Sequence, residues 1–145
     1  ENHQGEPTAD VLVRTSSLKG TVIEGADIPA LIDEIPVLAV MAAFADGTTV
    51  IRDAQELKVK ESDRIAVMVE NLKRMGADIE GTDDGMVIRG GKPLHGAVID
   101  PHMDHRVAMS FAVAGTVCQG PMEITDGDCV KISYPGFYED LYRLG

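Results

Sequence analysis

The stretch PVLAVMAAFA at residues 36–45 decides the fold of this chain. It contains no charged side chain, Pro36 suits the first turn of a helix, and Gly47 follows shortly after the run. A second stretch, VAMSFAVAG at residues 107–115, is apolar on nearly all sides. A helix that is apolar all round must be buried. Two such helices in a short chain predict an α/β (α+β) fold with buried helices and outer sheets, the reverse of a doubly wound fold.

Shorter segments around these two helices have the patterns of strands and of exposed helices. The strand segments alternate apolar with polar residues or carry short apolar runs between turn residues. The exposed helices instead have apolar residues at a spacing of three and four. We predict strands at residues 11–14, 21–23, 48–52, 85–91, 97–100 and 122–125, buried helices at 36–45 and 104–117, and amphipathic helices at 62–75 and 137–144.

The chain also repeats itself. LKGTVI at residues 18–23 resembles LHGAVI at 94–99, and GTTVIRD at 47–53 resembles GPMEITD at 120–126. We therefore predict two repeat units, at about residues 8–92 and 93–145, each built as strand, buried helix, strand and amphipathic helix. A pseudo-symmetry axis would place equivalent turns, and the charges they carry, on one face. The alternative is that the repeats are architectural and the charges are simply those of exposed turns.

The charged stretch KVKESDR at residues 58–64 leads directly into the amphipathic helix at 62–75. Ser62 or Asp63 is a natural N-cap, which puts Arg64 in the first helical turn. The helix dipole disfavours a cation there, and a local rule broken in this way often marks a functional site. The segment predicts an anion bound by backbone N–H groups, Lys60 and Arg64. The alternative is a solvated charge run with local ion pairs.

Two further basic clusters precede predicted helices. PHMDHR at residues 101–106 places His105 and Arg106 at the start of the second buried helix, and Lys131 lies just before Ser133-Tyr134-Pro135, a plausible helix start. Three such clusters predict one polyanion site assembled from separate turns. A metal site at His102, Asp104 and His105 is the alternative, although their spacing matches no common zinc motif.

Composition limits the class of protein. The 145 residues carry a net charge of −11 and include no Trp, which argues against nucleic acid but not against a small anionic substrate in a local basic cleft. No apolar run approaches the ~20 residues that span a bilayer. Cys118 and Cys129 lack metal-ligand spacing, so we expect a disulfide-free, cytoplasmic protein. The polar start at Glu1 is typical of a piece of a longer protein.

These residues resemble the C-terminal part of the 5-enolpyruvylshikimate-3-phosphate (EPSP) synthase family. The resemblance covers essentially the whole chain, including Gly5-Glu6-Pro7 near its start. It rests most specifically on Lys-Glu-Ser-Asp-Arg at residues 60–64 and Asp-His-Arg at 104–106, with Asp33 before them and Lys131 after them. It implies a fold of repeated βαβαββ units with helices inside, an inside-out α/β barrel. This chain would supply two units of one domain, and the N-terminal half of the enzyme would be absent.

The resemblance also implies a reaction. The family transfers the enolpyruvyl group of phosphoenolpyruvate to the 5-hydroxyl of shikimate 3-phosphate and releases phosphate, without a metal or another cofactor. Asp33 and Glu61 match its catalytic carboxylates. The implied roles are binding of shikimate 3-phosphate by Asp33 and Lys60, binding of phosphoenolpyruvate by Arg64, Arg106 and Lys131, and possible contacts from His105 and Glu56.

The partners implied in this way are the two anionic substrates and the missing N-terminal domain, not nucleic acid or a membrane. Because the site is a cleft between two domains, the chain alone is expected to be inactive and to bind weakly. Two alternatives remain open at this point. The chain could belong to the related UDP-N-acetylglucosamine enolpyruvyl transferase, or it could be a non-catalytic scaffold with the same fold.

Overall fold

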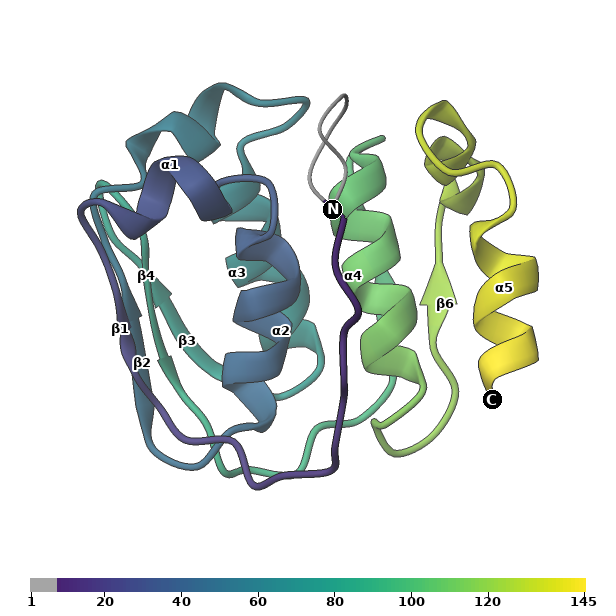
Figure 1. The fold of residues 1–145 in the computed structure, drawn as a ribbon, viewed down its shortest axis with the longest axis horizontal. Coiled ribbons are helices and arrows are strands. Elements are labelled where there is room, and N and C mark those ends of the chain that lie inside the picture. Colours follow the sequence, from purple (N-terminus) through teal and green to yellow (C-terminus); the bar gives the residue numbers. More distant parts are fainter. Residues whose placement is uncertain (1–7) are drawn as a thin grey trace.

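The computed structural model describes residues 8–145, which form a mixture of helices and strands (Figure 1). Gly5, Glu6 and Pro7, which contribute to the family resemblance, lie outside the described residues. In chain order the elements are β1 (Val22–Ile23), α1 (Asp27–Leu31), α2 (Ile35–Phe44), β2 (Thr48–Ile51), the 3₁₀ helix η1 (Gln55–Val59), α3 (Arg64–Arg74), β3 (Asp78–Gly81), β4 (Met86–Arg89), β5 (Val98–Ile99), α4 (His105–Gly115), β6 (Glu123–Ile124), the 3₁₀ helix η2 (Gly127–Ile132) and α5 (Phe137–Leu144).

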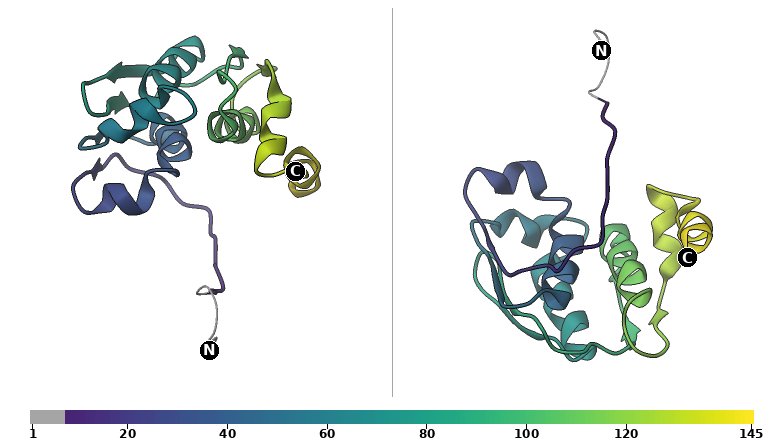
Figure 2. Two further views of the ribbon diagram at one scale, coloured as in Figure 1. Left: turned by 90° about the horizontal axis from the view of Figure 1, so that it is seen from above. Right: turned by 60° about the horizontal axis from the view of Figure 1, so that its bottom comes forward.

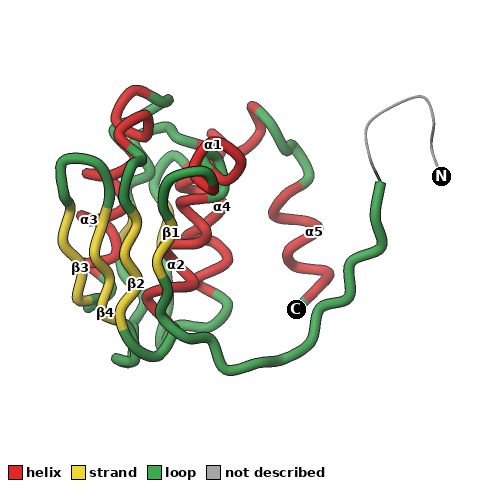
Figure 3. The backbone as a smooth tube through the Cα atoms, turned by 60° about the vertical axis from the view of Figure 1, so that its left-hand side comes forward, coloured by secondary structure: helices red, strands yellow, loops and turns green. Residues whose placement is uncertain are grey.

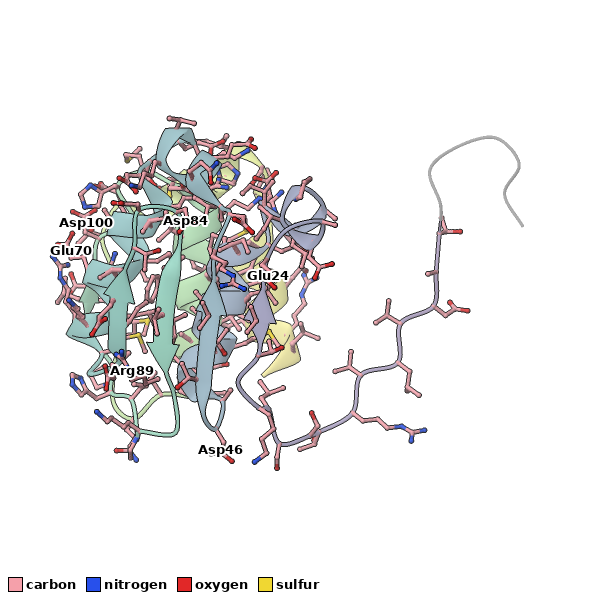
Figure 4. The ribbon with its side chains drawn as sticks, turned by 90° about the vertical axis from the view of Figure 1, so that its left-hand side faces the viewer. Glu24, Asp46, Glu70, Asp84, Arg89 and Asp100 are labelled. Atoms are coloured by element: carbon pink, nitrogen blue, oxygen red, sulfur yellow. The ribbon has the colours of Figure 1, made fainter. Side chains whose placement is uncertain are left out.

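The first sheet has four strands in the order β1-β2-β4-β3. β1 and β2 are parallel, whereas β4 is antiparallel to both of its neighbours. Figure 3 shows this sheet on the outside with the helices behind it. Figure 4 faces its outer side, where Arg89 on β4 forms ion pairs of 3.2 Å with Asp78 and Glu80 of β3. One face of the sheet is therefore charged and the other packs on the core.

Helices α2 and α4 lie side by side, as their apolar sequences predict (Figure 2). Six of the ten residues of α2 and six of the eleven residues of α4 are buried. The expectation that these two helices would be the most buried is only partly correct, because α3 also buries six of eleven residues. α3 lies under the sheet, while α2 and α4 leave an apolar strip partly exposed that includes Met41 and Val113, at 42% and 38%.

The second sheet is smaller and repeats the start of the first. β5 and β6 pair in parallel, as β1 and β2 do, and the isolated parallel bridges Lys19–Asp46 and His95–Gln119 precede them. The 3₁₀ helices η1 and η2 follow β2 and β6 at equivalent places. These correspondences match the echoes in the sequence. The division into units at about residue 92 stays a prediction.

Two points of secondary structure need correction, one predicted strand that does not form and one strand that the sequence does not indicate. Residues 11–14 are not a strand: Val11, Leu12 and Val13 are at least 76% exposed, and no pairing with another described segment is found. β3 was not predicted, because only Ile79 among its residues is a large apolar one. The last helix, α5, is confirmed with the predicted bounds; it is half-buried along one side, and Leu144 at its end is 87% exposed.

No helix among residues 8–145 combines the length and the apolar character that crossing a membrane requires.

Candidate active site

Three helix starts meet at one end of the protein, where α2, α3 and α4 begin (Figure 1). Asp33 lies in the turn before α2, Arg64 is the first residue of α3, and Asp104 is the N-cap of α4. The guanidinium of Arg64 joins them: Nη1 donates to Asp33 Oδ1 at 3.0 Å, and Nε donates to Asp104 Oδ2 at 2.8 Å. These residues, far apart in sequence, therefore form one cluster, as the repeat predicts.

The Arg64 side chain is only 1% exposed, which is rare for an arginine. Its third partner is Glu61, whose Oε2 accepts a hydrogen bond from Nη2 at 2.7 Å. Three carboxylates thus surround a cation that stands at the unfavourable positive end of a helix. These carboxylates offset the unfavourable position of the Arg64 cation at the start of α3. Two of them come from other turns, so the sequence next to Arg64 does not reveal them.

Asp104 is completely buried and uses both carboxylate oxygens. Oδ1 accepts hydrogen bonds from the backbone N–H groups of Arg106 and Val107, which caps α4, and Oδ2 accepts from Ser62 Oγ at 3.0 Å. Burial by itself raises the pKa of this carboxyl, but the hydrogen bond and charge of Arg64 outweigh burial, and the net pKa is lowered. Asp104 therefore stays ionised beside Arg64.

Asp33 also contacts the second predicted substrate-binding residue. Lys60 Nζ lies 3.7 Å from Asp33 Oδ1 and 3.0 Å from Glu56 Oε1. The hydrogen bond from Arg64 lowers the pKa of Asp33, and the charges of Lys60 and Arg106 act in the same direction. The hydrogen bond to Glu56 raises the pKa of Lys60. Glu56 therefore belongs to the cluster through Lys60.

Arg106 approaches the cluster from α4. Its Nη1 donates to the backbone carbonyl of Asp33 and to Glu34 Oε1, both at 3.2 Å, and its side chain is 37% exposed. It lies at the mouth of a groove of about 210 Å³ that descends between α2 and α4. The groove is mostly apolar and is lined in part by Val37, Met109 and Val113. Arg106 is thus the cation of this cluster that is most open to a ligand.

Lys131 does not contact the cluster. It lies within η2, is 60% exposed, and pairs with Asp128 of the same 3₁₀ helix at 2.8 Å. The expected helix start just after it is wrong, because α5 begins at Phe137 and Ser133 to Pro135 form a turn. The backbone N–H of Tyr134 bonds to the carbonyl of Val130, which closes η2 there.

Some of the backbone N–H groups at these helix starts already donate to capping carboxylates. Asp63 Oδ1 caps α3 by accepting from Ala66 N at 3.0 Å, and Asp104 caps α4. The amides of Ala66, Arg106 and Val107 are therefore not free to bind an anion, and the prediction that backbone N–H groups at the start of α3 help to hold one stays a prediction. His105 is buried at 9% exposure, and its Nδ1 has no hydrogen-bond partner among the described residues.

Sequence reasoning missed the central place of Asp104 and Ser62. The sequence patterns indicate Asp104 only as part of the Asp-His-Arg motif or as an alternative metal ligand. The available signal was an N-cap residue before a buried helix, whose carboxylate must itself be buried and so needs a cation. The alternative metal site does not form: His102 faces Glu70 and Asp100 at 3.8 and 3.7 Å, while Asp104 faces Arg64. Residues 8–145 contain no cluster of three metal-ligating side chains.

Comparison with known proteins places the chain in a family. A sequence profile of EPSP synthase (3-phosphoshikimate 1-carboxyvinyltransferase) matches residues 2–141. The chain belongs to the EPSP synthase family. Relatives named 3-phosphoshikimate 1-carboxyvinyltransferase from Gloeobacter violaceus and Shouchella clausii are 59% and 54% identical over 140 residues, 97% of this chain. The chain spans about a third of the length of these relatives, 32% and 33%.

The fold agrees with solved members of the EPSP synthase family. An EPSP synthase structure from Acinetobacter baumannii superposes with a TM-score of 0.85 at 46% identity, over 89% of this chain and 31% of that chain. A second EPSP synthase structure from the same organism gives a TM-score of 0.81 at 42% identity. These matches confirm the predicted fold class, a partial domain of the EPSP synthase type.

Proposed function

We propose that this chain is part of a 3-phosphoshikimate 1-carboxyvinyltransferase and forms one wall of its active site. The proposed substrates are phosphoenolpyruvate and shikimate 3-phosphate, and the second wall belongs to the rest of the full-length protein. The observation that carries the proposal is the shared guanidinium of Arg64, which hydrogen-bonds Asp33 at 3.0 Å and Glu61 at 2.7 Å. Two carboxylates held on one cation are suited to proton transfers at neighbouring atoms of a single reaction.

The proposed first step is an addition. Asp33 accepts the proton of the 5-hydroxyl group while that oxygen forms a bond to C2 of phosphoenolpyruvate. Glu61 donates a proton to the methylene carbon, so the double bond becomes a methyl group. The lowered pKa of Asp33 keeps it ionised, which is the form that a base requires. Lys60 contacts the ring hydroxyls or the proton in transfer.

The second step is an elimination that returns Asp33 and Glu61 to the protonation states in which they began. Glu61 takes a proton back from the methyl group, the carbon–oxygen bond to phosphate breaks, and the double bond forms again. Phosphate leaves with the proton that Asp33 had accepted. The products are the enolpyruvyl ether and inorganic phosphate, and no cofactor is required.

The cations bind the charges of phosphoenolpyruvate in this proposal. Arg106 is open to a ligand and has a planar, bidentate donor set. Arg64 is fully occupied by its three carboxylates, so substrate reaches it only when one moves aside. Glu61 is half exposed and is therefore the carboxylate that we propose moves aside. Once it leaves Arg64, its side chain can reach the methylene carbon of phosphoenolpyruvate. Lys131 joins from η2 as the cleft closes.

The comparisons favour this activity over the UDP-N-acetylglucosamine enolpyruvyl transferase, because the matching relatives carry the EPSP synthase name. A non-catalytic scaffold is the outcome to be excluded by assay. Phosphate release by the full-length protein that contains this chain, dependent on both substrates, tests the activity. The cytoplasmic location expected from the sequence is part of the proposal, and cell fractionation tests it.

Two variants of the full-length protein separate the proposed roles. Glu61→Gln keeps the shape of the site and should lower kcat by about 10²–10⁴-fold with little change in KM, as expected for loss of a general acid–base group. Arg106→Ala should chiefly raise KM for phosphoenolpyruvate, since a charge-assisted hydrogen bond worth about 1.5–3 kcal/mol is lost. Normal kcat in Glu61→Gln would show that Glu61 does not carry the proton.

A further inference from the structure

Asn71 is a completely buried polar residue on α3, and the proposed reaction gives it no role. Its side-chain amide pairs with the backbone of Asp100 in both directions. Nδ2 donates to the Asp100 carbonyl at 2.7 Å, and Oδ1 accepts from the Asp100 N–H at 3.0 Å. Nδ2 also donates to the Val67 carbonyl of its own helix at 3.0 Å. The amide thus holds one point of another segment of backbone and uses both of its N–H donors.

The segment that Asn71 holds is strained. His102 and Met103 both have left-handed backbone conformations, with φ of 51° and 60°. A non-glycine residue in this region costs of order 1–3 kcal/mol and persists only where its surroundings fix it. The turn is fixed by the Asn71 pair at Asp100, by His102 N donating to Asp100 Oδ1 at 2.8 Å, and by Asp104 N donating to the Pro101 carbonyl at 3.0 Å. Asp100 and Glu70, beside the turn, are labelled in Figure 4.

The strained turn ends at Asp104, the buried partner of Arg64. α3 therefore contacts the chain before α4 at two places: Asn71 holds Asp100 where the turn begins, and Arg64 holds Asp104 where it ends. Arg106 follows two residues later and receives its position from the same turn. The distance between the cations of α3 and α4 depends on both contacts.

We propose that Asn71 is a positioning residue that sets the geometry between Arg64 and Arg106 through the backbone of Asp100. The expected change in kinetics rests on the proposed function, whereas the expected shift of the turn and of α4 does not. Without the amide pair, the left-handed turn relaxes, Asp104 shifts from Arg64, and the start of α4 carries Arg106 away from its place beside Asp33. A displacement of about 1 Å far from the reacting atoms can cost up to about 100-fold in rate.

The test uses the full-length protein with Asn71→Leu and Asn71→Asp. Leucine removes both hydrogen bonds, whereas aspartate keeps the volume and places a carboxylate against the Asp100 carbonyl. Both variants should raise KM for phosphoenolpyruvate and lower kcat/KM by roughly 10- to 100-fold. Should Asn71→Leu fail to fold, Asn71→Asp carries the test.

Thr125→Val is the matched control. Thr125 Oγ1 donates to the carbonyl of Ile99, the residue before Asp100, at 3.2 Å, so this variant also loses a side-chain hydrogen bond to that segment. It should lower the unfolding temperature without changing KM. The same pattern in the Asn71 variants would overturn the proposal, because it would mean that Asn71 only stabilises the fold.

Hydrogen exchange gives a readout that does not depend on activity. The backbone N–H groups of Arg106 and Val107, capped by Asp104, should exchange faster in the Asn71 variants and at the wild-type rate in Thr125→Val. Unchanged exchange would contradict the structural part of the proposal. If the wild-type protein releases no phosphate, the proposed function fails, yet the exchange measurement still decides whether Asn71 positions α4.

Discussion

Arg64 and Asp104 form a buried ion pair that connects α3 to α4. Removing two charges from water costs several kcal/mol per ion, and the pair repays this only through close geometry and additional hydrogen bonds. Both conditions hold, because Asp104 also accepts hydrogen bonds from two backbone N–H groups and from Ser62. The pair therefore fixes the relative position of two helices, and each partner depends on the other to remain charged.

We expect Arg64→Leu to destabilise the protein by about 3–5 kcal/mol near pH 7, since it leaves the Asp104 carboxylate buried without a cation. In the wild type the folded-state pKa of Asp104 is lowered. Its contribution is therefore complete above about pH 4, the ordinary pKa of Asp, and is lost as the pH falls through the folded-state pKa. In the variant, burial raises this pKa, so the penalty shrinks on acidification. Denaturant unfolding at several pH values measures the difference.

Arg89→Leu is the control for this prediction. Arg89 also pairs with two carboxylates, but its side chain is 44% exposed on the outer face of the sheet. Exposed pairs contribute at most about 1 kcal/mol, and this loss should depend little on pH. Equal losses in the two variants would show that the burial of Arg64 has no energetic consequence.

Two glycines, one next to each sheet, allow neighbouring backbone segments of that sheet to approach closely. A Cβ atom at Gly20 would lie 2.3 Å from the Thr48 carbonyl oxygen, and one at Gly96 would lie 1.9 Å from that of Pro121. Both glycines follow an isolated parallel bridge and precede a parallel strand pair. The sequence echo LKGTVI and LHGAVI therefore repeats a backbone contact, which is why glycine occupies the third position of both.

Gly96→Ala should destabilise the protein by about 1–3 kcal/mol or more, because backbone must move to accept the methyl group. Gly136→Ala is the matched control: the N-cap of α5 has φ of −91°, and a Cβ there meets nothing closer than 3.7 Å. That substitution should change stability little. Thermal unfolding of both variants checks the prediction, which fails if Gly96→Ala unfolds at the wild-type temperature.

The elements that sequence could predict are those whose own residues determine them. Residues 36–45 and 107–115 are apolar on every side, so burial and helix follow directly from composition. β3 could not be found in this way, because it is held by its pairing with β4 rather than by its own apolar residues. Residues 11–14 have the composition of a strand, but a strand also needs a partner, and the described chain offers none.

The candidate site could also be predicted in part, where its residues lie in recognisable sequence patterns. Charged residues at helix starts and the repeat indicated that Asp33, Arg64 and Arg106 meet, and they do. The burial of Arg64 was not predictable, since its partners Asp33 and Asp104 lie 31 and 40 residues away. Lys131 remains apart in this structure, so its proposed substrate contact depends on the rest of the protein.

The charged cluster that we propose as one wall of the active site is negative rather than positive. Asp33, Glu34, Glu56, Glu61 and Asp104 carry five negative charges, against three positive charges on Lys60, Arg64 and Arg106, which leaves −2. The chain as a whole carries −11. Phosphoenolpyruvate, the proposed substrate, bears a phosphate and a carboxylate, so the net charge of this cluster would repel it.

We therefore expect the isolated chain to bind phosphoenolpyruvate more weakly than about 1 mM, a free energy of about −4.1 kcal/mol, and to release no phosphate from the two substrates. Calorimetric titration of the chain, with circular dichroism to establish that it is folded, measures this. Glu34→Gln with Glu56→Gln would bring the local charge to zero and should strengthen binding at low salt, where screening is weakest. Binding tighter than 1 mM by the unmodified chain would show that this wall alone suffices, and that the cations of the rest of the protein serve the reaction rather than the capture of substrate.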